Sequence, residues 1–236
     1  MFKKNICLIA AFALFTGCVQ KDARLETQDL ASYWFNAGNL NNNKIVINKN
    51  FTEQYNDGKK TSSYIDFNIY KKSKTDLNQI EQYSFFEDIN KQNYKSMISN
   101  KSVDLKYNIF KNEIKEKSDI DEKQISSYKR NIKINDKVIE ENDIDGNSLV
   151  CTFSNYYENV NAKDKINEFF KAKYFTQDKK YNDVIELLCK DSAVDGEYYI
   201  YMAKNLGIIL FMRKDTDDGS LEESYSILDT QTIMEQ

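Results

Sequence analysis

Hydrophobic and polar residues alternate along much of this chain with the two-residue period that is typical of β-strands. Lys44–Asn48 is short and rich in β-branched residues, and Ser63–Tyr70 alternates aromatic or aliphatic residues with polar ones. Asp57-Gly58 lies between these runs, and Asp-Gly is a strong signal for a hairpin turn because both positions need a positive φ. The sequence therefore predicts a β-hairpin that turns at Asp57-Gly58.

The last third of the chain has the same pattern. Short apolar runs are separated by Asp-Gly pairs, and strands and turns at this spacing are typical of an antiparallel meander. We expect strands at Tyr181–Leu187, Glu197–Met202, Leu206–Met212 and Leu221–Leu228, with tight turns at Asp195-Gly196 and Asp218-Gly219.

The middle of the chain predicts further strands. They are expected at Ile125–Ile134, Lys137–Glu140 and Leu149–Phe153, with a turn at Asp145-Gly146-Asn147 before the last of them. Ile166, Phe169 and Phe170 recur at helical spacing, which fits a short helix or an edge segment equally well.

Two segments depart from the strand pattern. In Asp76–Ile98 the apolar residues recur every three to five positions, which favours an amphipathic helix broken near Asn90. The alternative is that Tyr83, Phe85 and Ile89 belong to strands, because aromatic residues also favour sheets. Asn112–Lys123 interleaves acidic and basic residues, and we expect a solvated loop or helix there.

Composition is consistent with one folded domain that is mainly β. The chain has 236 residues, of which 41% are hydrophobic and 13% aromatic, enough for a core, and 30% are charged. We predict an α+β fold dominated by an antiparallel meander sheet, in a curved half-barrel or a sandwich, with one or two short helices. The net charge of −4 argues against a nucleic-acid partner.

The beginning of the chain has the features of an export signal. Lys3 and Lys4 precede Ile6–Phe15, an apolar run that as a helix would span only about half of a bilayer core of ~30 Å. Leu14–Cys18 resembles a bacterial lipobox, apart from Phe15, where such boxes usually have Leu. The resemblance implies cleavage before Cys18 and acylation of that cysteine. An ordinary cleaved signal with an accidental cysteine is the alternative.

The lipobox defines the expected organisation of the chain. We predict a signal peptide at residues 1–17, a polar lipidated tether at 18–30 and a single envelope domain at 31–236. The membrane is then a partner through the lipid anchor, since two or three acyl chains hold a protein lastingly and one does not. Val19 follows the cysteine and no Asp does, which favours the outer membrane, facing the periplasm.

Candidate chemistry is sparse. The chain contains no His, which excludes His-based metal sites, Ser-His-Asp triads and Cys-His dyads. We expect no catalytic residue, no metal and no cofactor, and we interpret the acidic pairs as solvated turn residues because no calcium-loop spacing is present. These pairs are Asp217-Asp218, Glu222-Glu223, Glu140-Glu141 and Asp143-Asp145.

The aromatic residues and two cysteines complete the candidate residues. Tyr156-Tyr157 and Tyr198–Tyr201 could stack a sugar or another flat ligand, although strand packing is the simpler interpretation, as it is for Trp34. Cys151 and Cys189 are left after the signal and the lipid anchor take Cys7 and Cys18. Since exported thiols tend to be oxidised, we predict a disulfide between them; two separate buried cysteines are the alternative.

One pattern is shared with known proteins. Tyr181–Leu187 followed by Glu197–Ile209, with Tyr33–Asn39 near the N-terminus, resembles a broad group of β-rich bacterial envelope lipoproteins of mostly unknown function. This chain departs from the group in having Asn205 for Gly and Ile209 for Val, and in lacking an early Pro. The resemblance implies an antiparallel sheet and an envelope location, and it implies no activity. We then expect Gly207 at a strand bend, where glycine is needed either because another part of the chain comes close or because φ is positive.

Three functions fit these observations. The first is a non-enzymatic envelope lipoprotein that binds or scaffolds something, with another envelope protein as a candidate partner. The second is an immunity or inhibitor lipoprotein that protects the periplasm from a toxin, for which a flat acidic patch would be evidence. The third is a carboxylate-dependent hydrolase, for which a compact pocket with two convergent carboxylates would be evidence. We favour the first.

Overall fold

The computed structural model describes residues 26–35, 40, 43–87, 89, 92–118, 124–142, 147–193, 195–217 and 219–235. In these ranges the chain forms helices α1 (Leu30–Trp34), α2 (Tyr94–Ser99) and α3 (Ala162–Phe170). The strands are β1 (Gln28–Asp29), β2 (Lys44–Asn56), β3 (Lys59–Lys72), β4 (Gln79–Phe85), β5 (Leu105–Ile109), β6 (Glu113–Ser118), β7 (Gln124–Lys129), β8 (Asn131–Ile132), β9 (Lys137–Asn142), β10 (Ser148–Asn161), β11 (Lys180–Asp191), β12 (Asp195–Ala203), β13 (Gly207–Asp217) and β14 (Ser220–Glu235).

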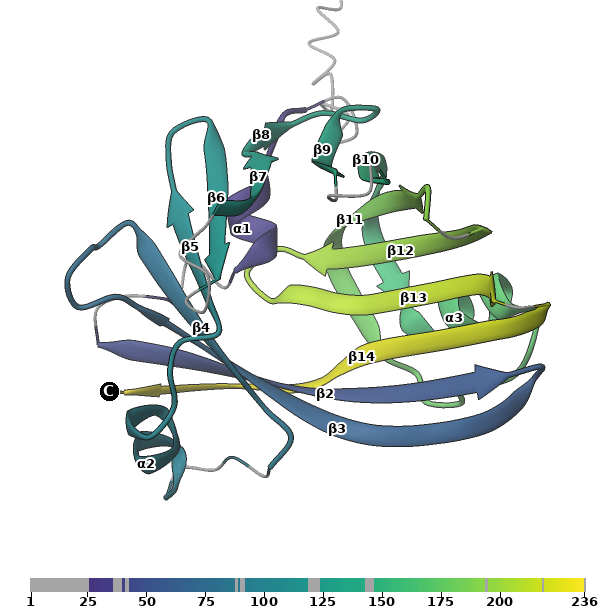
Figure 1. The fold of residues 1–236 in the computed structure, drawn as a ribbon, viewed down its shortest axis with the longest axis horizontal. Coiled ribbons are helices and arrows are strands. Elements are labelled where there is room, and N and C mark those ends of the chain that lie inside the picture. The colour runs from purple at the N-terminus through teal and green to yellow at the C-terminus, as the bar shows by residue number, and fades with distance from the viewer. Residues whose placement is uncertain are drawn as a thin grey trace, which may run out of the picture.

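Twelve of these strands form one antiparallel sheet in the order β7-β6-β5-β4-β3-β2-β14-β13-β12-β11-β10-β9, while β1 pairs with β8 (Figure 1). The sheet consists of two meanders. They are joined where β14, at the C-terminal end of the chain, pairs along the whole of β2. The predicted fold class, mainly β with an antiparallel meander, is confirmed. The described residues contain three short helices where one or two were expected.

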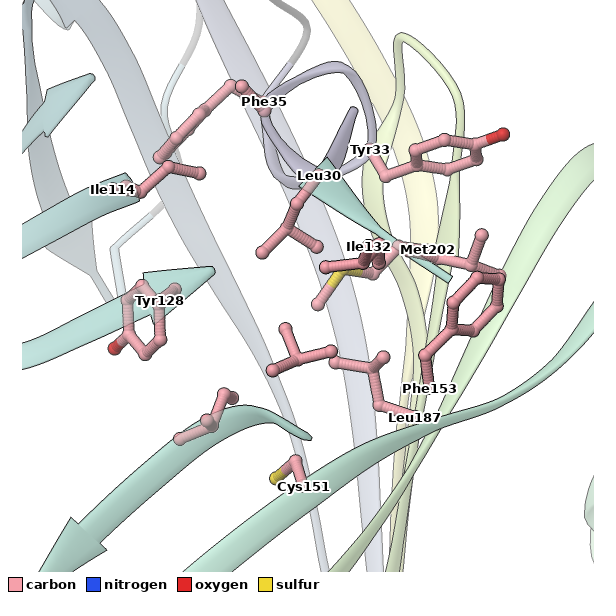
Figure 2. Packing of buried hydrophobic residues seen from close by; sticks show 14 of the residues in the cluster. Leu30, Tyr33, Phe35, Ile114, Tyr128, Ile132, Cys151, Phe153, Leu187 and Met202 are labelled. Atoms are coloured by element: carbon pink, nitrogen blue, oxygen red, sulfur yellow. The ribbon is translucent and has the colours of Figure 1, made fainter. Parts of the chain in front are cut away.

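The sheet curls around a core in which α1 lies. Its edge strands β7 and β9 approach each other, and the Ser126 hydroxyl on β7 donates a hydrogen bond to Glu141 on β9. Side chains from α1 and from the strands around it converge in the centre, as Figure 2 shows. The labelled members of this cluster are Leu30, Tyr33, Phe35, Ile114, Tyr128, Ile132, Cys151, Phe153, Leu187 and Met202.

Helix α1 is only five residues long and is held by tertiary contacts. Asp29 accepts a hydrogen bond from the Ala31 amide and two from the Arg130 guanidinium, at 2.8 and 2.9 Å. The hydrogen bond from Arg130 is the main reason that the pKa of Asp29 is lowered. Leu30 is fully buried. The folded region therefore includes residues 28–30, which were expected in the tether.

Two further apolar clusters lie outside the central core. Helix α3, capped at its start by the Asn161 side chain, packs Ile166 and Phe170 against the face of β11–β14 that is opposite to α1. Helix α2 packs Tyr94 against Ile45 and Tyr83, near the other end of the sheet. No helix in the described ranges has the length and apolar character needed to cross a membrane.

The segment 76–98 is mostly not the predicted helix. Gln79–Phe85 is strand β4, and only Tyr94–Ser99 is helical. Tyr83 and Phe85 lie on one face of that strand, so the apolar residues follow the two-residue period after all. The prediction of a solvated loop or helix at Asn112–Lys123 was also wrong in the part that is described. Glu113–Ser118 is strand β6, and its Ile114 is fully buried.

The predicted turns were correct in part. Asp57 (φ 48°) and Gly58 (φ 76°) form the turn between β2 and β3, and Gly219 (φ 82°) lies in the turn between β13 and β14. Asp195-Gly196 is not a turn but the beginning of β12. Residues 143–146 and Asp218 lie outside the described ranges.

Candidate functional site

A polar pocket lies where β13, β14 and β2 run side by side. In one rung of the sheet Arg213 pairs with Ser224, which pairs with Gln54. In the next rung Asp215 pairs with Glu222, which pairs with Asn56. Side chains two residues apart on a strand point to the same face, so these six residues share one face of the sheet, opposite to α3. With Thr61 and the neighbouring residues Tyr55 and Glu223 they line a pocket of about 320 Å³. The side chains of Tyr55 and Glu223 themselves point to the α3 side, where both contact Tyr174.

Asp215 is the most unusual residue of this pocket, because its carboxyl group is only 2% exposed. The Arg213 guanidinium donates to one carboxylate oxygen, Oδ2, through Nε at 2.7 Å and also through Nη2. The other oxygen, Oδ1, is buried and has no hydrogen-bond partner among the described residues. Arg213 itself lies 5.3 Å from the centre of the Tyr198 ring.

Gly196 makes room for this carboxylate. It pairs with Asp215 across β12 and β13, and a Cβ atom at position 196 would lie only 2.7 Å from the Asp215 Cβ. Glycine within a strand often marks such a close approach. Gly196 therefore serves packing beside Asp215, which explains why Asp195-Gly196 does not form the predicted turn.

The opposite face of the same strands holds a second buried carboxylate, Glu53. Its Oε2 accepts hydrogen bonds from the hydroxyls of Tyr55, at 2.6 Å, and Tyr225, while Lys60 donates to Oε1. Burial alone would raise the pKa of Glu53, but the hydrogen bonds from Lys60, Tyr225 and Tyr55 outweigh burial, so that its pKa is lowered. All groups of this network have partners, and we interpret it as structural.

Three of the tyrosines that were candidates for stacking a ligand come together beneath α3. Tyr199 and Tyr201 line a pocket of about 270 Å³ together with Glu186, and the Tyr157 ring lies 6.3 Å from the Tyr201 ring. The Lys165 ammonium lies 4.4 Å from the centre of the Tyr157 ring, and the Tyr157 hydroxyl donates to Glu186 at 2.9 Å. Because the protein's own lysine covers an aromatic face, this arrangement favours packing over ligand stacking.

The other aromatic candidates lie elsewhere. Tyr198 packs beside Phe211 and Arg213 in the wall next to the polar pocket. Trp34 stacks on Tyr128 at 4.6 Å between ring centres and packs against the central core.

Cys151 and Cys189 are direct partners in the antiparallel pairing of β10 and β11. The structure places their sulphur atoms 2.00 Å apart, as a disulfide, and both residues are buried in the central core. Cys18, the expected acylation site, lies outside the described ranges.

The acidic pairs singled out in the sequence do not converge where they are described. Neighbouring strand residues point to opposite faces, so Glu222 faces the polar pocket while Glu223 accepts a hydrogen bond from Tyr174 on the α3 side. Glu140 forms an ion pair with Lys137 and Glu141 accepts a hydrogen bond from Ser126. Within the described part of the chain, no group of His, Cys, Asp or Glu residues is arranged to hold a metal ion.

Sequence reasoning missed Asp215, Arg213 and Glu53. A signal for each was present: Arg213-x-Asp215 and Glu53-x-Tyr55 place a charged or hydroxyl group two residues from a carboxylate, on the same face of a strand. What could not be seen is which strands would lie beside them.

The comparisons with known proteins place the chain in no family. No protein-family model matches it, and no curated protein matches it. One similar solved structure, from Bacteroides fragilis, is described as a "putative exported protein with YmcC-like fold". It is 11% identical, with a TM-score of 0.41, over 85% of this chain and 99% of that one.

Proposed function

We propose that this protein is a non-enzymatic lipoprotein of the cell envelope whose β domain binds a small polar ligand in the Asp215 pocket. The membrane attachment rests on the sequence: the charged start, the apolar run Ile6–Phe15 and the lipobox-like segment ending at Cys18. In this proposal residues 1–17 are removed, Cys18 is acylated, and the domain is held at the periplasmic face of the outer membrane. No nucleic acid takes part.

The binding role is supported above all by the Oδ1 atom of Asp215. A buried acceptor without a partner costs about 1–3 kcal/mol, and more when it is charged. A ligand that donates a hydrogen bond to this atom would recover that cost. The pocket also presents Glu222 against the single positive charge of Arg213. Its excess of negative charge favours a ligand with a cationic nitrogen, such as a primary amine.

Binding fits this pocket better than hydrolysis does. A hydrolase with two carboxylates needs one of them to give up or accept a proton. Asp215 already accepts two hydrogen bonds from Arg213 on Oδ2, so this oxygen is occupied by the protein's own guanidinium. It is therefore suited to accept a hydrogen bond from a ligand, and less suited to act as an acid.

The test compares two probes of equal length, putrescine and the uncharged 1,4-butanediol, by isothermal titration calorimetry on the mature domain. Putrescine should bind and butanediol should not. Asp215→Asn should weaken putrescine binding by about tenfold or more, because a charged hydrogen bond contributes about 1.5–3 kcal/mol. Glu222→Gln should weaken it less, and Glu140→Gln, an exposed carboxylate outside the pocket, should leave it unchanged. Absence of putrescine binding, or equal binding by wild type and Asp215→Asn, would refute the proposal.

A further inference from the structure

A second pocket, unrelated to the Asp215 pocket, lies between α2 and the sheet. It has a volume of about 390 Å³, which is within the range of about 300–1,000 Å³ found for small-molecule sites. In Figure 1 helix α2 lies outside the sheet, near the C-terminal end of β14, and the Tyr94 hydroxyl donates a hydrogen bond to the Glu235 carbonyl. The lining residues are Ile45, Lys71, Lys74, Tyr83, Tyr94, Lys95, Ile98 and Ser99.

The floor of this pocket is apolar and built into the third hydrophobic cluster. Ile45, Tyr83 and Tyr94 are buried members of the cluster, and Ile98 packs against it from α2. The apolar surface is thus recessed below the rim. A narrow chain can enter such a site, whereas a flat surface would contact only the rim.

The rim is positive. Three lysines line the pocket, and no carboxylate of the described residues does. Lys71 is already neutralised by Glu81, at 3.0 Å, and lies above the Tyr83 ring. Lys74 and Lys95 are exposed, and neither forms an ion pair with a carboxylate of the described residues. Two available ammonium groups above an apolar floor stand out in a chain with a net charge of −4.

We infer that this pocket binds a single-chain anionic lipid. The acyl chain would lie on the floor formed by Ile45, Tyr83 and Ile98, and the anionic head group would pair with Lys74 and Lys95. Apolar contact gives the affinity for the chain, and the two ammonium groups give the selectivity for negative charge. A peptide or an intact bilayer would not match both the recessed floor and the localised charge.

The test uses two lipids with the same 14-carbon chain, lysophosphatidylglycerol, which is anionic, and lysophosphatidylcholine, which is zwitterionic. Both are titrated below their micelle concentrations into the mature domain, and binding is measured by calorimetry. The anionic lipid should bind with one-to-one stoichiometry. The double variant Lys74→Gln/Lys95→Gln should weaken that binding by about tenfold or more, since each lysine near an anionic lipid contributes about 1 kcal/mol.

The matched control is Lys111→Gln/Lys133→Gln, which removes the same charge from two exposed lysines elsewhere and should change affinity by less than about twofold. Ile98→Ser should weaken the binding of both lipids, and thermal unfolding of this variant shows whether it is folded. Asp215→Asn should have no effect, so this inference and the proposed function fail independently. Lack of one-to-one binding, equal loss in the control variant, equal affinity for both lipids, or binding only to phosphatidylglycerol vesicles would overturn the inference.

Discussion

At the scale of single residues, Glu53 makes the stability of the fold depend on pH. Its pKa is lower in the folded protein than the unfolded value of about 4.3. A carboxylate whose pKa is lower in the folded state stabilises the fold at pH values above its unfolded pKa. This stabilisation is lost as the pH falls through the folded pKa. Glu53→Gln keeps the shape but removes the charge, and should lower the free energy of unfolding by about 1–3 kcal/mol at pH 7.

The measurement is urea unfolding of both proteins between pH 7 and pH 3. The difference between wild type and Glu53→Gln should shrink below about pH 4.3 as Glu53 becomes protonated. Glu140→Gln, which breaks only an exposed pair with Lys137, should change stability by less than about 0.5 kcal/mol throughout. A difference that stays constant with pH would contradict this role for Glu53.

The predicted disulfide between Cys151 and Cys189 is a second contribution of single residues to stability. The cysteines are 38 residues apart, and in the chain-entropy model a disulfide closing such a loop adds about 4 kcal/mol. The double variant Cys151→Ala/Cys189→Ala should lose a stability of this order in urea unfolding. Thiol counting on the denatured, unreduced mature protein should find none, and two after reduction; two free thiols before reduction would rule out the bridge.

At the scale of elements, the strands were more predictable than the helices. The period of two residues and the Asp57-Gly58 turn are local signals, and the hairpin they predict is present. Helix α1 gave no such signal, because five residues are too short for a helical period. It forms because Arg130, 101 residues away in the chain, binds the Asp29 cap. The turn predicted at Asp195-Gly196 was wrong, because in the sequence a glycine that relieves crowding within a strand looks the same as a glycine that forms a turn.

The bend between β12 and β13 was predicted correctly and can be tested. Gly207 has φ of 91°, and a Cβ atom there would lie 3.1 Å from the Trp34 carbonyl oxygen at the end of α1. Gly207→Ala should lower the free energy of unfolding by about 2–3 kcal/mol, through both backbone strain and crowding. Gly219→Ala is the control, because Gly219 also has a positive φ but has nothing within 4 Å of an added Cβ. Equal losses in urea unfolding would exclude crowding against α1.

At the scale of the whole molecule, the sheet and its chemistry were not equally predictable. The two meanders follow from local patterns, but their junction does not: β14 pairs with β2, and Tyr225 meets Glu53 from 172 residues away. The Asp215 pocket depends on that junction, since β14 lies between the strands that provide Asp215 and Asn56. A single sequence shows which residues share a strand face, but not which distant strand will lie beside them.

The proposed attachment of the whole domain to a membrane depends on Cys18. Two or three acyl chains at this residue would anchor the domain lastingly, since each buried methylene adds about 0.8 kcal/mol of membrane affinity. In wild type the N-terminal peptide should begin at Cys18 and carry acyl mass, and the protein should partition into detergent. Cys18→Ser should abolish the acyl mass and the detergent partitioning. Cys7→Ser should change neither, because Cys7 lies in the segment that the proposal removes with the signal. An unmodified N-terminal peptide in wild type, or a Cys18→Ser protein that still enters detergent as a mature chain, would show that this residue is not the anchor.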